Sequence, residues 1–209
     1  MNISKTPTLR RAVLDHGELR NPLKKGFHTG PCADQLKQVA HTINRDNHMA
    51  HAQKVSTCLW FNTEAETAAQ FYVSLFENSR ITGLSRYGKG ARMPEGTVLV
   101  VTFELAGTEF MALNGGPLFP FTEASSMVAQ CDSQSEIDRL WTALIADGGK
   151  EVQCGWLKDR YGLSWQIVPS RIRDMMQSND QAKTDRAFAA VMTMVKIDIA
   201  KLEAAYEGK

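Results

Sequence analysis

The fold is decided by one predicted hairpin, Cys154-Gly155-Trp156-Leu157-Lys158-Asp159-Arg160-Tyr161-Gly162-Leu163-Ser164-Trp165-Gln166-Ile167-Val168-Pro169. Asp159 and Gly162 suit the first and fourth positions of a type I turn, with Gly162 in the left-handed conformation of a G1 bulge. This turn fixes the register of the two strands. The predicted cross-strand pairs are Asp159 with Leu163, Lys158 with Ser164, Leu157 with Trp165, and Trp156 with Gln166.

The two faces of this hairpin differ in chemistry. Cross-strand partners lie on the same side of a sheet, and the side alternates along each strand. One face therefore carries an indole, a cation, a hydroxyl and an amide, from Trp156, Lys158, Ser164 and Gln166. The other face carries Leu157, Trp165 and Ile167, which are typical of a core. We expect the mixed face to be a pocket wall.

The hairpin completes the second of two similar units, each a strand, a helix and three further strands. The first unit has predicted strands at 55–61, 80–87, 97–105 and 109–114, with a helix from about residue 62 to 77. The second has strands at 126–131, 150–153, 156–158 and 163–168, with a helix that ends at Gly148-Gly149. Predicted capping boxes, Thr63/Glu66 and Ser133/Glu136, begin the two helices. The repeat predicts an α+β fold made of two βαβββ modules.

The sequence divides into three parts. Residues 53–170 form the paired domain, with modules at 55–115 and 125–169, and residues 171–209 form a helical tail with a third predicted capping box, Ser178/Gln181. Residues 1–52 contain three prolines and little periodicity. They are either a disordered basic extension or no part of the native protein, with Met49 as the true start. In both cases we expect them to add nothing to the fold.

Charge and cysteine content restrict the function classes. Residues 1–53 hold eight Lys/Arg and four Asp/Glu, while the remainder holds 16 and 19. A mildly acidic domain lacks the clustered cations that nucleic acid requires. No apolar run approaches the ~20 residues that span a bilayer, so no membrane partner is expected. The four cysteines are widely spaced and without a CxxC, which favours free thiols and a cytoplasmic location.

Several separated motifs resemble one family. They are Cys58-Leu59-Trp60-Phe61-Asn62, Phe71-Tyr72, Asn78-Ser79-Arg80-Ile81, Ala112-Leu113-Asn114-Gly115-Gly116 and Gly155-Trp156-Leu157-Lys158-Asp159. From residue 55 to 206 the chain resembles the PhnB-like branch of the vicinal oxygen chelate superfamily, which includes glyoxalase I and the bleomycin-resistance proteins. The resemblance implies a curved sheet whose concave side holds the site, with helices on the convex side. It also implies a homodimer, which would cover the open sheet edges.

The metal site of that superfamily is not expected here. Its four ligands come from the first and last strands of each unit, and the matching positions are Ser56, Ala112, Ser126 and Gln166. Alanine cannot bind a metal, and a lone amide is too weak a ligand to hold a catalytic divalent ion. All five histidines lie before residue 52, which leaves the domain no imidazole ligand. The sequence therefore predicts neither a metal nor an organic cofactor.

Strand alternation supplies the rest of the candidate site. In the first module, Ser56, Cys58 and Trp60 are expected on the concave face, as are Phe110, Ala112 and Asn114. In the second module, Ser126, Val128 and Gln130 join the hairpin residues. The candidate ligand-binding residues are Trp60, Asn114, Ser126, Gln130, Trp156, Lys158, Ser164 and Gln166. Such a neutral, aromatic pocket suits a small organic molecule.

Two function classes follow from this pocket. One is a metal-free protein that binds a small organic molecule, and an anionic one in particular, since Lys158 among neutral residues should seek an anionic partner. The other is an enzyme that uses metal-independent acid–base chemistry, for which the candidates are Lys158, Glu123 and Tyr161. Members of the branch often carry the name demethylubiquinone methyltransferase. Because the connection after the first strand has no glycine-rich turn for S-adenosylmethionine, we interpret that name as a label.

Overall fold

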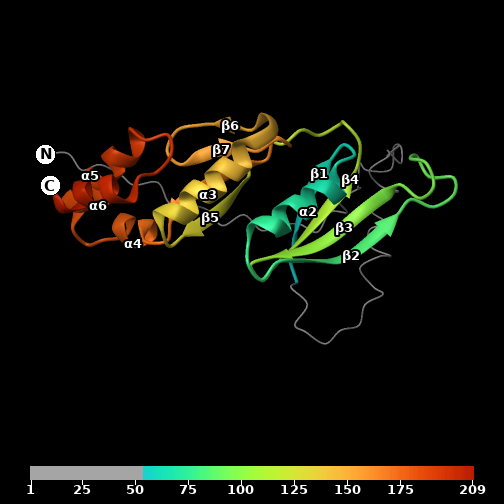
Figure 1. Ribbon diagram of the computed structural model, residues 1–209, viewed down its shortest axis with the longest axis horizontal. Helices are drawn as coiled ribbons and strands as arrows, with labels where there is room; N and C mark the ends of the chain where they lie inside the picture. Colours follow the sequence, from blue (N-terminus) through green and yellow to red (C-terminus); the bar gives the residue numbers. More distant parts are fainter. Residues whose placement is uncertain (1–53) are drawn as a thin grey trace, which may run out of the picture.

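The computed structural model describes residues 54–209, so the predictions for the extension at 1–52 lie outside the described residues. Two four-stranded sheets, each with one helix across one face, stand side by side, and a helical tail follows the second sheet (Figure 1). The strand orders are β1-β4-β3-β2 and β5-β8-β7-β6, with the first and last strands of each unit parallel. The prediction of an α+β fold with two βαβββ modules and a helical tail is confirmed.

The bounds of the elements agree closely with the predicted ones. The first unit contains β1 (Thr57–Phe61), α2 (Ala65–Leu75), β2 (Arg80–Arg86), β3 (Val98–Leu105) and β4 (Thr108–Asn114). The second contains β5 (Ser126–Cys131), α3 (Gln134–Ile145), the short η1 (Ala146–Gly148), β6 (Lys150–Glu151), β7 (Trp156–Lys158) and β8 (Ser164–Pro169). The tail contains α4 (Ile172–Met176), α5 (Gln181–Met192) and α6 (Ile199–Glu207).

The hairpin between β7 and β8 has the predicted register. Trp156 pairs with Gln166, Leu157 with Trp165, and Lys158 with Ser164. The Asp159 amide donates to the Leu163 carbonyl over 3.0 Å, and Gly162, with φ of 83°, donates to the Asp159 carbonyl over 2.9 Å. Turn chemistry alone therefore sets which side chains of this hairpin share a face.

The two units share one core, in which α2 and α3 both participate. Phe76, next to α2, stacks on Trp165 of β8 with ring centroids 5.9 Å apart. The Tyr72 hydroxyl of α2 donates to Asp159 in the turn of the second unit over 2.8 Å, where both side chains are buried. Arg139 of α3 donates to the Leu75 carbonyl over 2.9 Å. Apolar packing and buried hydrogen bonds thus fix how one unit lies against the other.

The predicted helix caps are correct for one helix of three. Ser133 caps α3 by accepting from the Glu136 amide. The N-cap residue of α2, Glu64, makes no capping hydrogen bond with its side chain. Instead, Oδ1 of Asn114, at the end of β4, accepts a hydrogen bond from the Ala65 amide over 2.8 Å. Asp180, two residues after the predicted Ser178, caps α5 by accepting from the Lys183 amide. Asn114, distant in the sequence, thus replaces the predicted capping box of α2, and the carboxylate of Asp180 replaces that of α5.

The tail is packed onto the second unit by backbone bonds and a small apolar cluster. The amides of Cys154 and Gly155 donate to the Met194 and Val195 carbonyls over 2.7 and 2.8 Å. Below them, Ala187, Val191, Ile197 and Leu202 join Met175 in a buried cluster. In Figure 1 the tail lies at the end of the second unit away from the first unit.

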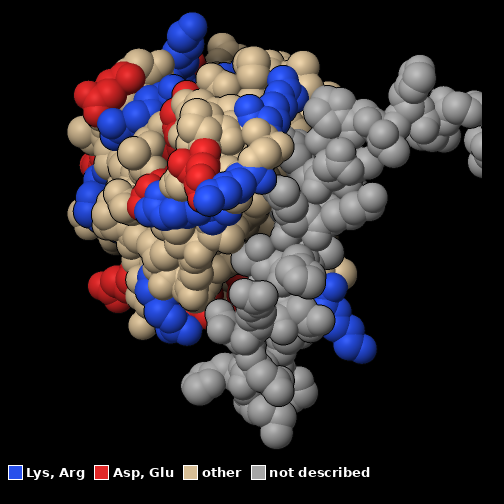
Figure 2. All heavy atoms as spheres, turned by 90° about the vertical axis from the view of Figure 1, so that its right-hand side faces the viewer, with Lys and Arg blue, Asp and Glu red and all other residues tan. Residues whose placement is uncertain are grey.

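The surface of the described residues carries charges of both signs. Figure 2 shows Lys/Arg and Asp/Glu interspersed over the coloured part of one end face, without a large area of a single sign. Within residues 54–209, no helix has the length and apolar content that crossing a membrane requires. The three described cysteines, Cys58, Cys131 and Cys154, are free thiols.

Candidate functional site

The face of the second sheet that points away from α3 carries two rows of side chains, which we call the polar face. Strand pairing places Ser126, Ser164 and Lys158 side by side in one row, and Val128, Gln166 and Trp156 in the next. The opposite face, with Leu157, Trp165 and Ile167, is buried in the core. The polar face therefore brings five of the eight candidate ligand-binding residues together, and Gln130 lies beyond them, exposed, opposite Val168.

Lys158 forms an ion pair on this face. Its Nζ lies 2.5 Å from Oε1 of Glu123, which belongs to the linker between β4 and β5. The lysine side chain is 29% exposed and the glutamate side chain 64% exposed. The hydrogen bond from Lys158 holds the pKa of the Glu123 carboxyl below its usual value. Two candidates for acid–base chemistry thus meet. The anion expected for Lys158 was a ligand, whereas the partner in this structure is a glutamate of the same chain.

The hydroxyl of Ser164 is the most unusual group on the polar face. Ser164 is 1% exposed, and its Oγ has no hydrogen-bond partner among the described residues. It lies in the same row as Lys158, its direct cross-strand neighbour. Gln166, in the next row, donates from its side-chain amide to the Ser126 hydroxyl over 2.9 Å. A buried hydroxyl without a partner is costly, so this row offers a donor that a bound molecule can satisfy.

The predicted facing of β4 is wrong. Phe110 and Ala112 belong to the core against the helices, and Asn114 is buried beneath α2, where its Oδ1 caps Ala65 and its side-chain amide donates to the Val98 carbonyl over 3.0 Å. Met111 and Leu113 occupy the concave side instead. The reason is the parallel register of β1 and β4, which puts Met111 beside Cys58 and Leu113 beside Trp60. Asn114 positions a helix and lies away from the polar face.

Trp60 lies on the predicted side of the first sheet, so it is not part of the polar face, which belongs to the second sheet. Its indole nitrogen donates to the Gly116 carbonyl over 2.8 Å, and its ring meets Phe119 edge-on with centroids 5.0 Å apart. A Cβ on Gly115 would come within 2.1 Å of the indole, so only glycine leaves room for it there. These contacts tie Trp60 to the start of the linker.

Tyr161 is not on the polar face. Its ring meets those of Phe61, Phe71 and Tyr72 with centroids 5.9, 6.4 and 6.0 Å apart. These partners lie in the first unit, so Tyr161 packs at the contact between the two units. Of the three candidates for acid–base chemistry, only Lys158 and Glu123 meet.

The residues at the superfamily's metal positions do not form a ligand set. Ser126 donates or accepts only through a hydroxyl, Gln166 is engaged with it, and Ala112 points into the core. The concave side of β4 offers Met111 and Leu113 in its place. Among residues 54–209 no three His, Cys, Asp or Glu side chains gather as metal ligands would. Because these donors do not fit a divalent ion, we derive no chemistry through one.

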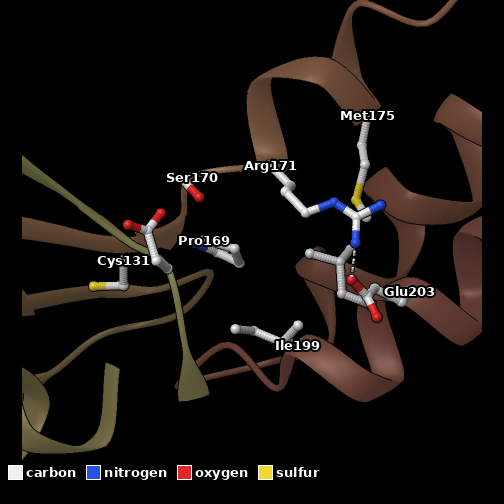
Figure 3. Close-up of a pocket in the computed structure, with 9 residues that line it drawn as sticks. Cys131, Pro169, Ser170, Arg171, Met175, Ile199 and Glu203 are labelled. Atoms are coloured by element: carbon white, nitrogen blue, oxygen red, sulfur yellow. Dashed lines mark hydrogen bonds and ion pairs between the residues drawn. The ribbon is translucent and has the colours of Figure 1, made fainter. Parts of the chain in front are cut away.

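Two cavities among the described residues lie beside the second unit, one at the tail and one at the edge strand β5. One, of about 140 Å³, lies between the second unit and the tail, with Arg171 and Glu203 paired at its edge and Cys131 opposite them (Figure 3). Burial raises the pKa of the Cys131 thiol to about 12, so it is not a nucleophile at neutral pH. The other, of about 160 Å³, lies between the units beside Phe76 and Phe110. Both are smaller than typical ligand pockets, and neither contains a candidate ligand-binding or acid–base residue, although Phe110 and Val128, expected on the concave face, line the second.

Comparison with known proteins gives a consistent family. Residues 53–168 match the model of the family described as 3-demethylubiquinone-9 3-methyltransferase. Among curated proteins no significant match was found. A solved structure described as a putative 3-demethylubiquinone-9 3-methyltransferase, PhnB protein, from Bacillus cereus is 39% identical, with a TM-score of 0.52. The match covers 56% of this chain and 99% of that one.

Two further solved structures extend the comparison. A protein from Staphylococcus aureus is 30% identical over 56% of this chain and 97% of its own, with a TM-score of 0.27. The fosfomycin resistance protein FosX from Listeria monocytogenes, complexed with Mn(II) and sulfate, is 14% identical over 61% of this chain and 98% of its own, with a TM-score of 0.42. The family model ends at residue 168, before the helical tail begins.

Proposed function

Because the chain belongs to the 3-demethylubiquinone-9 3-methyltransferase family, the PhnB-like branch of the glyoxalase and bleomycin-resistance superfamily, we propose that its polar face binds a small organic anion without a metal. The observation that carries this proposal is the half-buried ammonium of Lys158 next to the unpartnered hydroxyl of Ser164. A cation beside a hydroxyl donor is a suitable arrangement for one negatively charged group.

The second row of the polar face suits the organic part of such a molecule. Trp156 is partly exposed and offers an aromatic ring, while Val128, 54% exposed, offers an aliphatic surface. Gln166 lies between them and retains its carbonyl oxygen as an acceptor, since its amide nitrogen donates to Ser126. Apolar surface with a few placed polar groups is the usual composition of a small-molecule site.

Metal-independent catalysis is the second candidate function, and the Lys158–Glu123 ion pair favours it. A lysine and a carboxylate 2.5 Å apart can exchange roles as acid and base when a substrate comes between them. The two functions differ in turnover: a binding protein returns its ligand unchanged, whereas an enzyme converts it. Methyl transfer rests on the family's name alone, because the connection between β1 and α2, residues 62–64, contains no glycine for a nucleotide-type turn.

A screen of small organic acids by thermal shift tests the proposed function. A carboxylate or phosphoryl compound present at about 100 times its Kd contributes about 2.7 kcal/mol to stability. For a chain of this size that corresponds to about 5–10 °C in Tm. We expect a subset of anions to give such a shift and their neutral isosteres to give none. Equal shifts from the neutral isosteres, or none from any anion, would contradict the proposal.

We further propose that the protein is a homodimer. β1 and β5 are edge strands of their sheets in the described part of the chain, and Val128 and Gln130 of β5 are exposed. Proteins tend to cover such edges, and pairing two copies does so without new elements. Static light scattering of the full chain at micromolar concentration should give about twice the 23.2 kDa of one chain. A mass of one chain across that range would reject the dimer.

A cytoplasmic location remains a prediction from cysteine usage. It agrees with the free thiols of Cys58, Cys131 and Cys154, which a reducing compartment maintains.

A further inference from the structure

The linker between β4 and β5, residues 115–125, delivers Glu123 to the polar face. Its first half is held by the first unit: the Gly116 carbonyl accepts from Trp60, and Phe119 packs on the same indole. Phe121 then packs edge-on against Phe61 with centroids 5.2 Å apart. A turn follows, in which the Ser125 amide donates to the Thr122 carbonyl over 3.4 Å. Glu123 lies within this turn, so fixed aromatic contacts aim its carboxylate at Lys158.

The two partners of this ion pair are unequally buried. The Glu123 side chain is 64% exposed and lies on a turn of the linker. The Lys158 side chain is 29% exposed and lies on a strand of the second sheet. Releasing Glu123 into water therefore costs little, since an exposed ion pair contributes little to stability. Leaving Lys158 without an anion costs more, because it is the more desolvated of the two groups. The carboxylate is thus the replaceable half of the pair.

We propose that the Glu123 carboxylate is an internal substitute for the carboxylate of the ligand, so that the molecules bound on the polar face are small organic carboxylic acids. This inference rests on the proposed function of that face. An incoming carboxylate takes the place of Glu123 at Lys158 and accepts a hydrogen bond from the Ser164 hydroxyl, which has no partner among the described residues. Glu123 turns outward on its turn. The exchange forms and breaks only hydrogen bonds and ion pairs.

The group that now occupies Lys158 favours a carboxylate over a phosphoryl group at this position. Strand pairing places Lys158 between the neutral Ser164 and a second lysine, the exposed Lys150 of β6, and its ion-pair partner is the carboxylate of Glu123. An incoming carboxylate replaces that monoanion like for like, whereas a phosphoryl dianion brings one more negative charge to a partly buried sheet. Trp156 in the next row supplies a ring on which a planar or aromatic body can stack. An aromatic monocarboxylate matches both rows.

Competition from Glu123 has a measurable consequence. While Glu123 is bound to Lys158, the site is closed to a ligand carboxylate. The apparent Kd of the ligand therefore equals the Kd of the open site divided by the fraction of molecules in which the site is open. If Glu123 is bound to Lys158 about 80% of the time, the apparent Kd of the ligand is about fivefold higher than that of the open site. An occupancy of this size corresponds to the upper end of the stability that an exposed ion pair contributes. Removing the charge of Glu123 should therefore tighten carboxylate binding, which is the opposite of what loss of a contact residue does.

Titration of benzoate into the full chain by calorimetry tests this inference. The variants are Glu123→Gln, Lys158→Met and, as matched control, Glu207→Gln, which removes a carboxylate from a lysine ion pair of 2.8 Å in the tail. We expect Glu123→Gln to lower the Kd of benzoate about fivefold and Glu207→Gln to leave it unchanged. Lys158→Met should raise it about thirtyfold or more, as loss of a desolvated charge partner does. Benzamide, the neutral isostere, should bind Glu123→Gln and wild type equally.

The possible outcomes separate this inference from the proposed function. If benzoate binds wild type and Glu123→Gln equally while Lys158→Met loses it, the site binds anions but Glu123 is no substitute, and the inference is overturned. If inorganic phosphate binds and benzoate does not, the carboxylate class is wrong. If neither anion binds wild type or Glu123→Gln, the inference and the proposed function both fail.

Discussion

Replacing Asp159 with alanine should lower the free energy of unfolding by about 3–5 kcal/mol, the cost of leaving several buried donors unpaired. Asp159 is 2% exposed, and its carboxylate accepts hydrogen bonds from the Tyr72 hydroxyl over 2.8 Å and the Trp165 indole nitrogen over 3.0 Å. It also accepts from the amides of Tyr161 and Leu163 over 2.9 and 3.1 Å. Burial raises the pKa of this carboxyl, and these four donors oppose the rise.

The effect is large because Asp159 serves two purposes. It closes the turn that sets the hairpin register, and through Tyr72 it bonds the second unit to α2 of the first. Chemical denaturation should therefore show the loss in Asp159→Ala, a smaller loss in Tyr72→Phe, and non-additivity in the double variant. As control, Asp147→Asn removes the charge of an exposed carboxylate that pairs with Arg160 but suits the φ of 55° at this position, and it should cost less than about 1 kcal/mol. A loss of that small size in Asp159→Ala would show that the carboxylate does not hold the units together.

Replacing Lys158 with methionine should weaken the binding of an organic carboxylate by about 2–3 kcal/mol. That is the lower end for breaking a desolvated charge pair, because the lysine side chain remains 29% exposed. The Tm should change by no more than a few degrees, since the present partner, Glu123, is 64% exposed and becomes fully hydrated. Calorimetric titration measures the first quantity and a melting curve the second.

A matched variant separates charge from packing in that experiment. Trp156→Ala should also weaken binding, but it should lower the Tm as well, because it removes a partly buried indole from β7. Binding of every anion by Lys158→Met with wild-type affinity would show that the ammonium makes no contact with a ligand. A large fall in the Tm of Lys158→Met would instead assign the lysine a structural role.

The second unit is predictable from the sequence because the residues that decide its structure lie close together in the chain. Asp159 and Gly162 lie three residues apart and determine the turn, and the turn determines the pairs Trp156–Gln166 and Lys158–Ser164. β8 is flanked by strands on both sides, so pairing carries the same facing to β5. Local turn chemistry thus places four of the five polar-face candidates, and pairing with β8 places the fifth, Ser126.

The first unit was harder because β4 is buried on both faces. Every residue from Phe110 to Asn114 is buried, so alternation along the strand distinguishes two faces without saying which one the helix covers. Pairing with β1 decides the matter, and that pairing joins residues about fifty positions apart. Asn114 is polar, which favoured a cavity position, yet it satisfies the first turn of α2. Its position at the end of β4, beside the end of β1, is the feature of the sequence that indicates a helix-capping role.

The sequence does not predict that Lys158 and Glu123 meet. Both are candidates for acid–base chemistry, but the anion expected for Lys158 is a ligand, and the path of the linker depends on Phe119 and Phe121 packing against the first unit. Such long-range aromatic contacts have no periodic signal. The same holds for Tyr161, whose place between the units follows from the packing of its ring on α2 and β1.

The crystal structure of the full chain with benzoate tests the central claim most directly. We expect the carboxylate of benzoate to lie within hydrogen-bond distance of the Lys158 Nζ and the Ser164 hydroxyl. Its ring should lie against Trp156, and Glu123 should have turned away from the lysine. Benzoate bound elsewhere, for example in the cavity beside Arg171 and Glu203, with the Lys158–Glu123 ion pair intact, would contradict that claim.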